Sequence, residues 1–142
     1  MIKLSVYTSK YANVFYIPDQ KLIEYYWKVT TEEMTDQEYR FIVFEVSSII
    51  SQNYQQREYQ LENYLLDNSL FLYEIPEETR IWQRDYIFSK LIDSGGKKVA
   101  VVMSDGYLSQ HLIEQTFLAS KETSMITEYF NDIEKARVWL LS

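Results

Sequence analysis

The chain has 142 residues, enough for one ordinary domain, and its 46% hydrophobic and 25% charged residues exclude a wholly disordered protein. The absence of cysteine and the single histidine exclude disulfides, thiolate zinc sites, cysteine nucleophiles and any site that needs two histidines. A net charge of −7 without a basic patch predicts no nucleic-acid partner, and no apolar run reaches the ~20 residues that span a bilayer.

The first 28 residues predict three strands joined by short connections. Residues 3–8, 12–17 and 21–28 are rich in aromatic and β-branched types, which strands favour. Pro18-Asp19-Gln20 is a turn signal between the second and third of these segments. Because such connections are too short for crossovers, we expect an antiparallel meander.

A long helix is predicted from about residue 31 to 53, with Thr30 and Glu33 as its capping box. Phe41 and Phe44 fall off its apolar stripe and, at i, i+3 spacing, form one small patch. This patch has three interpretations: burial on a second side of the helix, contact in a homodimer, or contact with another partner. The stripe that we expect in the core consists of Tyr39, Ile42, Val43, Val46, Ile49 and Ile50.

The middle of the chain predicts a strand and then a second helix. Residues 59–67 alternate and then turn apolar, as a strand entering a sheet does. Pro76, followed by two glutamates, is a strong helix start, and Gly95-Gly96 marks the end of a helix that reaches about residue 93. The residues expected to be buried on this helix are Ile81, Phe88, Leu91 and Ile92.

The last third predicts a strand, a helix, a strand and a helix. Residues 97–103 read as a central parallel strand, 107–119 as a helix and 124–130 as another strand. Asn131 and Glu134 form the expected capping box of the last helix. The order βββαβαβαβα predicts one α/β domain over residues 1–142, with a mixed sheet and helices packed on it.

Spaced landmarks over roughly residues 11–141 resemble small bacterial proteins with the STAS fold, the fold of anti-sigma-factor antagonists. These landmarks are Leu65-Leu66-Asp67-Asn68, Ile75-Pro76-Glu77-Glu78, Trp82, the run from Gly95 to Val102, and the run from Phe130 to Leu140 with Trp139. The resemblance implies a STAS-like fold and a regulatory role. The same α/β plan occurs in the lipid-binding domain of phosphatidylinositol-transfer proteins.

The phosphorylation switch that the resemblance implies is not matched in this chain. Regulatory STAS domains carry an Asp-Ser-Ser-Gly-like segment after the middle strand, and its serine accepts the phosphate. Here the matching stretch is Pro76-Glu77-Glu78-Thr79, in which two carboxylates would repel an added phosphate. We therefore expect no phospho-serine switch, with Thr79 as the one residue of this stretch able to accept a phosphate.

Two loops at predicted strand ends are candidate binding segments, because open α/β sheets bind ligands beyond the carboxyl ends of their strands. Helix capping and turn formation are the competing explanation of the same residues. A pair of Asp67 and Asp105 would lack further oxygen ligands for a metal, and His111 has no matched nucleophile. The candidate residues are Asp67, Asn68 and Ser69 in one loop and Ser104, Asp105 and Gly106 in the other.

The sequence therefore predicts a non-enzymatic, cytoplasmic regulatory or protein-interaction module without catalytic residues, metal or cofactor. Its expected partner is another protein or a second copy of the chain. The alternative is a carrier or sensor of a small apolar or amphipathic ligand, suggested by the aromatic-rich composition and by the lipid-binding proteins of the same plan. A third hypothesis is an enzyme that uses Asp67, Asp105 and His111.

Overall fold

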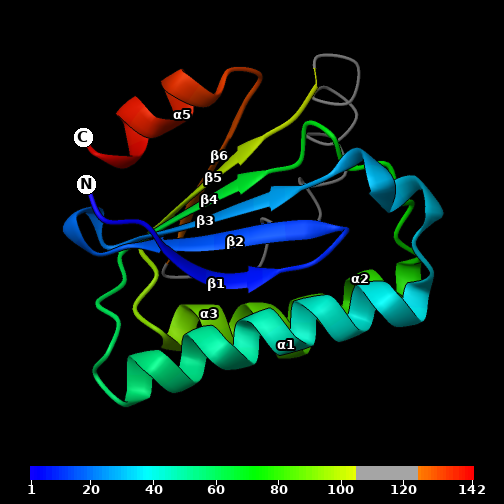
Figure 1. The fold of residues 1–142 in the computed structure, drawn as a ribbon, viewed down its shortest axis with the longest axis horizontal. Helices are drawn as coiled ribbons and strands as arrows, with labels where there is room; N and C mark the ends of the chain where they lie inside the picture. The colour runs from blue at the N-terminus through cyan, green and yellow to red at the C-terminus, as the bar shows by residue number, and fades with distance from the viewer. Residues whose placement is uncertain (105–124) are drawn as a thin grey trace.

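The computed structural model describes residues 1–104 and 125–142, which form an α/β fold around a six-stranded mixed sheet (Figure 1). The strands lie in chain order across the sheet. The first three strands pair antiparallel with one another, and the third to the sixth run parallel, so the expected meander and mixed sheet are confirmed. They are β1 (Leu4–Thr8), β2 (Ala12–Ile17), β3 (Leu22–Trp27), β4 (Asn63–Asp67), β5 (Lys98–Val102) and β6 (Ile126–Phe130).

Helices cover both faces of the sheet. In Figure 1, α1 (Asp36–Gln55) and the helical run after β4 lie on one face, and α5 (Ile133–Leu140) lies on the other. Among the described helices, none is long and apolar enough to cross a membrane. The helix expected at 107–119 lies outside the described residues. The helical run consists of α2 (Glu77–Trp82), the π-helical turn η3 (Gln83–Phe88) and α3 (Ser89–Asp93).

The first long helix begins five residues later than predicted. Its capping box is Thr35 with Glu38 rather than Thr30 with Glu33, and residues Val29–Glu33 form a short 3₁₀ helix. The reason lies in tertiary contacts, because the Thr30 hydroxyl donates to the backbone of the β1–β2 hairpin. Thr31 is fully buried and its hydroxyl donates to the Lys28 carbonyl at 2.7 Å.

The last helix is also capped by the neighbour of the predicted residue. Asp132, not Asn131, is its N-cap, and its Oδ1 accepts from the backbone N–H groups of Glu134 and Lys135 at 2.8 and 3.4 Å. A carboxylate is well suited here because it also faces the positive end of the helix dipole.

The helical run between β4 and β5 confirms the helix predicted from Pro76, but the side of it that is buried in the core differs from the predicted one. Ile81 is 44% exposed, whereas Ile87, which was not expected in the core, is 3% exposed. Phe88, Leu91 and Ile92 are half-buried. A π turn holds more residues than an α turn, so η3 shifts the buried face of the run relative to a regular helix.

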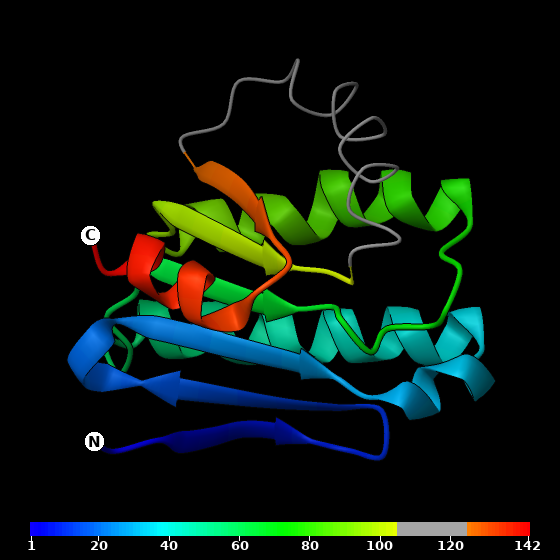
Figure 2. The same ribbon diagram turned by 90° about the horizontal axis from the view of Figure 1, so that it is seen from above.

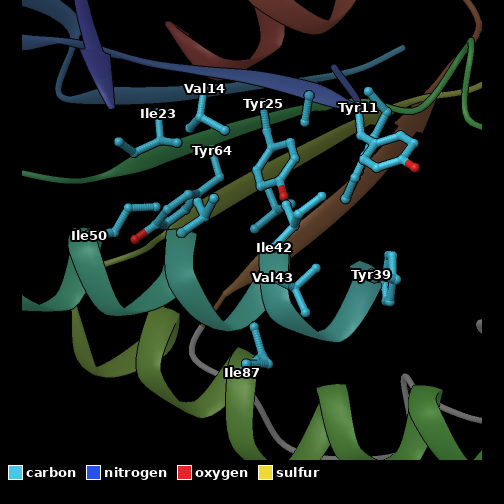
Figure 3. Close-up of a cluster of buried hydrophobic side chains, with 14 of the residues drawn as sticks. Tyr11, Val14, Ile23, Tyr25, Tyr39, Ile42, Val43, Ile50, Tyr64 and Ile87 are labelled. Atoms are coloured by element: carbon cyan, nitrogen blue, oxygen red, sulfur yellow. The ribbon is translucent and has the colours of Figure 1, made fainter. Parts of the chain in front are cut away.

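The main core lies between the sheet and the helices α1 and α3. Figure 3 shows Tyr25 and Tyr64 reaching from their strands towards α1, with Ile87 entering from the helical run. The predicted stripe on α1 is confirmed for five of its residues, and Ile49 is half-buried. A smaller cluster fills the space beneath α5 and contains Ile17, Leu22, Leu65, Ala100, Val102, Ala136 and Leu140.

Candidate functional site

Exposed aromatic residues mark the outer side of α1. Phe41 is 61% exposed and Phe44 is 51% exposed, so neither ring is buried within the chain. The Lys90 ammonium of α3 lies 4.3 Å from the centre of the Phe44 ring, a cation–π contact between the two helices. Tyr86, four residues before Lys90, is 64% exposed. We call Phe41, Phe44, Ile81 and Tyr86 the outer helical face.

A groove of about 380 Å³ lies beside Phe41, between the β1–β2 hairpin and α1. Its lining residues Tyr11 and Ile42 are 5% and 3% exposed, so Phe41 stands out from the groove that it borders. The groove is formed by Tyr7, Ser9, Lys10, Tyr11, Gln37, Glu38, Phe41 and Ile42.

Lys10 and Glu38, a cation and a carboxylate, both contact the Tyr11 side chain in this groove. The Lys10 ammonium lies 4.9 Å from the centre of the Tyr11 ring, and the Tyr11 hydroxyl donates to Glu38 Oε2 at 2.9 Å. Hydrogen bonds from the Thr35 backbone and from Tyr11 hold the pKa of Glu38 below its usual value. Glu38 is therefore a carboxylate at neutral pH, and the charges of this groove cancel.

The two candidate strand-end loops follow β4 and β5, which are neighbouring strands of the sheet. The Asn68 N–H, just after β4, donates to the Val102 carbonyl at the end of β5 at 2.8 Å. Asp67 Oδ1 accepts from the backbone N–H of Ser69 at 3.0 Å and from its hydroxyl at 2.6 Å. The Asp67 oxygen thus closes a local turn, which supports the turn-forming explanation of this loop.

The second loop is described only at its start. Ser104 is half-buried, whereas Asp105, Gly106 and His111 lie outside the described residues. The Asn68 Oδ1 atom is buried and has no hydrogen-bond partner among the described residues. Within residues 1–104 and 125–142, no group of three or more acidic or histidine side chains is placed to hold a metal.

The Thr79 side chain is fully buried at the contact between α1 and α2. Its hydroxyl donates to the Asp36 carboxylate at 2.8 Å and accepts from Arg40 Nη2 at 2.8 Å. The Tyr73 hydroxyl also donates to Asp36 Oδ1 at 2.8 Å. Burial works to raise the pKa of Asp36, but the hydrogen bonds from Thr79, Tyr73 and Arg40 outweigh it and leave the pKa lowered. This geometry favours a structural role for Thr79.

A buried ion cluster on the opposite face of the sheet was missed in the sequence. The Glu24 side chain is fully buried and pairs with Arg137 of α5. Lys3 Nζ lies 3.0 Å from the other Glu24 oxygen. The sequence signal is Glu24 itself, a charged residue among apolar residues of a central strand.

Comparisons of the chain with protein-family models, with curated proteins and with solved structures found no match. The functional argument therefore rests on the surfaces and contacts of the chain itself.

Proposed function

We propose that this chain is a non-enzymatic regulatory or protein-interaction module of the STAS-like type that works without a phospho-serine switch. The observation that carries the proposal is the exposure of Phe41 and Phe44 on the outer side of α1. Two phenylalanines in water lose the free energy that burial would supply, about 1.5–3 kcal/mol for a complete side chain. A protein surface that covers them recovers this free energy.

The neighbourhood of the two rings supports a protein partner. Ile81 and Tyr86 are exposed side chains on the helical run that packs beside α1, and the Lys90 ammonium of that run contacts the Phe44 ring. Aromatic residues surrounded by polar ones are the usual composition of an interface core with its rim. The groove beside Phe41 is open to solvent, which favours a side chain of a protein partner over a small apolar ligand that needs enclosure.

The surroundings of Thr79, the residue able to accept a phosphate, support a module that binds its partner without phosphorylation. Thr79 is buried, and its hydroxyl is engaged by Asp36 and Arg40. A kinase reaches this hydroxyl only if α2 separates from α1. Binding through the outer helical face needs no such separation.

Affinity capture with surface variants tests the proposal. The wild-type chain, the double variant Phe41→Ser/Phe44→Ser and the control Val138→Ser are used as baits in lysate of the source organism. Val138 is 71% exposed on α5, on the opposite face of the sheet, so it controls for loss of any exposed apolar residue. Light scattering after size exclusion measures self-association of the same three proteins.

The expected result is a protein, or a second copy of the chain, that binds the wild type and Val138→Ser but not the double variant. Circular dichroism shows whether the double variant is folded. The proposal is overturned if folded wild type and double variant retain the same proteins and have the same mass in solution.

A further inference from the structure

A projecting ring and a hollow lie side by side on the β1–β2 side of α1. Figure 2 shows β1 at the outer edge of the sheet, beyond α1. The groove of about 380 Å³ lies between this hairpin and the helix, and the Phe41 ring at its border is 61% exposed. A groove of this size is near the lower end of ligand pockets, which hold about 300–1,000 Å³, and suits one or two side chains.

A surface that carries both a projection and a hollow can bind a copy of itself. In an isologous contact the same patch is used twice about a two-fold axis, so a projection on one copy must meet a hollow on the other. Phe41 and the adjoining groove satisfy this condition within one patch.

The charges of the patch also fit a second copy. The whole chain carries a net charge of −7, so two copies repel each other over most of their surfaces. The groove contains one cation, Lys10, and one carboxylate, Glu38, whose charges cancel. A two-fold arrangement can place Lys10 of one copy towards Glu38 of the other, so this patch avoids the repulsion.

The edge of the sheet indicates that side chains rather than backbone make the contact. The pairing of β1 with β2 shifts register between Ser5 and Tyr7, a bulge in an edge strand. Bulges turn an edge away from straight pairing with another strand. The groove beside β1 therefore offers the more regular docking surface.

We propose that two copies of this chain associate through this groove, with Phe41 of each copy entering the groove of the other about a two-fold axis. The inference rests on the proposed function and names a second copy as the partner of α1.

Single-cysteine cross-linking tests the arrangement, because the chain contains no cysteine of its own. Gln37→Cys places a thiol in the groove one helical turn before Phe41, at an exposed position. Val138→Cys places the control thiol on α5. The expected result is a disulfide-linked dimer of Gln37→Cys under mild oxidation and only background cross-linking of Val138→Cys. Adding Phe41→Ser to Gln37→Cys should reduce the cross-linking of Gln37→Cys to the background level of Val138→Cys.

Sedimentation velocity over a concentration series measures the association itself. Phe41→Ser should weaken it about tenfold or more, as loss of a central aromatic residue does, whereas Val138→Ser should leave it unchanged. Lys10→Glu should weaken it at low salt and less so at high salt, because it sets two carboxylates against each other. Circular dichroism verifies that each variant is folded.

A wild-type chain that stays monomeric at its highest soluble concentration overturns the inference. Dimers whose cross-linking and affinity are insensitive to Phe41→Ser overturn it as well. If the wild type is monomeric but still captures another protein through Phe41 and Phe44, this inference fails and the proposed function stands. If neither self-association nor capture depends on these rings, both fail.

Discussion

Glu24 and Arg137 form an ion pair although 113 residues separate them in the chain. The pair joins β3 to α5, which otherwise contacts mainly β4, β5 and β6. The Glu24 side chain is fully buried and Arg137 is 29% exposed. A second guanidinium nitrogen donates to the Tyr26 hydroxyl at 2.7 Å, and Lys3 approaches from the N-terminal segment. Cations from both ends of the chain therefore meet on one buried carboxylate.

Arg137→Ala should lower the free energy of unfolding by about 2–4 kcal/mol, because it leaves the Glu24 carboxylate buried beside Lys3 alone. Urea denaturation followed by circular dichroism measures the change. Glu134→Gln is the control, since Glu134 is 80% exposed, lies 4.0 Å from Arg137 on the same helix and should change stability by less than about 0.5 kcal/mol.

Replacing both Glu24 and Arg137 with apolar residues should lower the free energy of unfolding less than removing Arg137 alone. In Glu24→Met/Arg137→Leu no buried carboxylate is left, and the Lys3 ammonium, whose side chain is 44% exposed, can turn to water, so much of the lost stability should return. If Arg137→Ala and Glu134→Gln unfold at the same urea concentration, the buried pair contributes nothing to stability.

The sequence predicted the mixed sheet and the buried stripe of α1 because both follow from local periodicity and connection length. It misplaced the start of α1 because Thr30–Glu33 and Thr35–Glu38 fit the same capping pattern. Only tertiary contacts of Thr30 and Thr31 decide between them.

The ion cluster and the groove could not be predicted for a different reason. Glu24 and Arg137 are adjacent only because α5 returns over the face of the sheet, and no local pattern contains that return. Phe41 and Phe44 were recognised as lying off the core stripe. Their exposure depends on where the helical run packs against α1.

Thr79→Val should lower the free energy of unfolding by about 1–3 kcal/mol. The substitution keeps the shape but removes the hydroxyl that donates to Asp36 and accepts from Arg40. Thr79→Ser keeps the hydroxyl and loses one methyl group, at a cost of about 1 kcal/mol. Thermal or urea unfolding of both variants and the wild type measures these differences in stability. Equal stability of Thr79→Val and the wild type would contradict the inferred role of this hydroxyl.

Several tyrosines should ionise late in alkaline titration, because burial raises the pKa of each phenol. Burial, aided by Glu24, raises the pKa of Tyr26 to about 12, and burial with a hydrogen bond to Asp36 raises that of Tyr73 to about 12. In the part of the chain that the structure describes, the other phenols with a raised pKa are Tyr25, Tyr39, Tyr59, Tyr64 and Tyr129.

The sign of the effect on stability follows from the direction of these shifts. An unfolded phenol titrates near pH 10, so the contribution of a raised pKa is complete below that pH and is lost as the pH rises towards 12. Stability measured in urea should therefore fall steadily above pH 10. Ultraviolet absorbance of phenolate should rise later in the folded chain than in urea, and coincident curves would contradict the burial of these rings.

Gly96→Ala should lower the free energy of unfolding by about 1–3 kcal/mol by overpacking the core. A Cβ at this position would lie 2.7 Å from Tyr64 Cε2 and 2.7 Å from Met125 Sδ. The methionine can move because its side chain is flexible, but the Tyr64 ring is 2% exposed and fixed between the sheet and α1.

A double-mutant cycle of Gly96→Ala with Met125→Ala separates the clash with Met125 from the clash with Tyr64. The double variant should be more stable than the sum of the two single effects predicts, because one clash is removed while that with Tyr64 stays. Strict additivity would show that Met125 does not restrict this glycine.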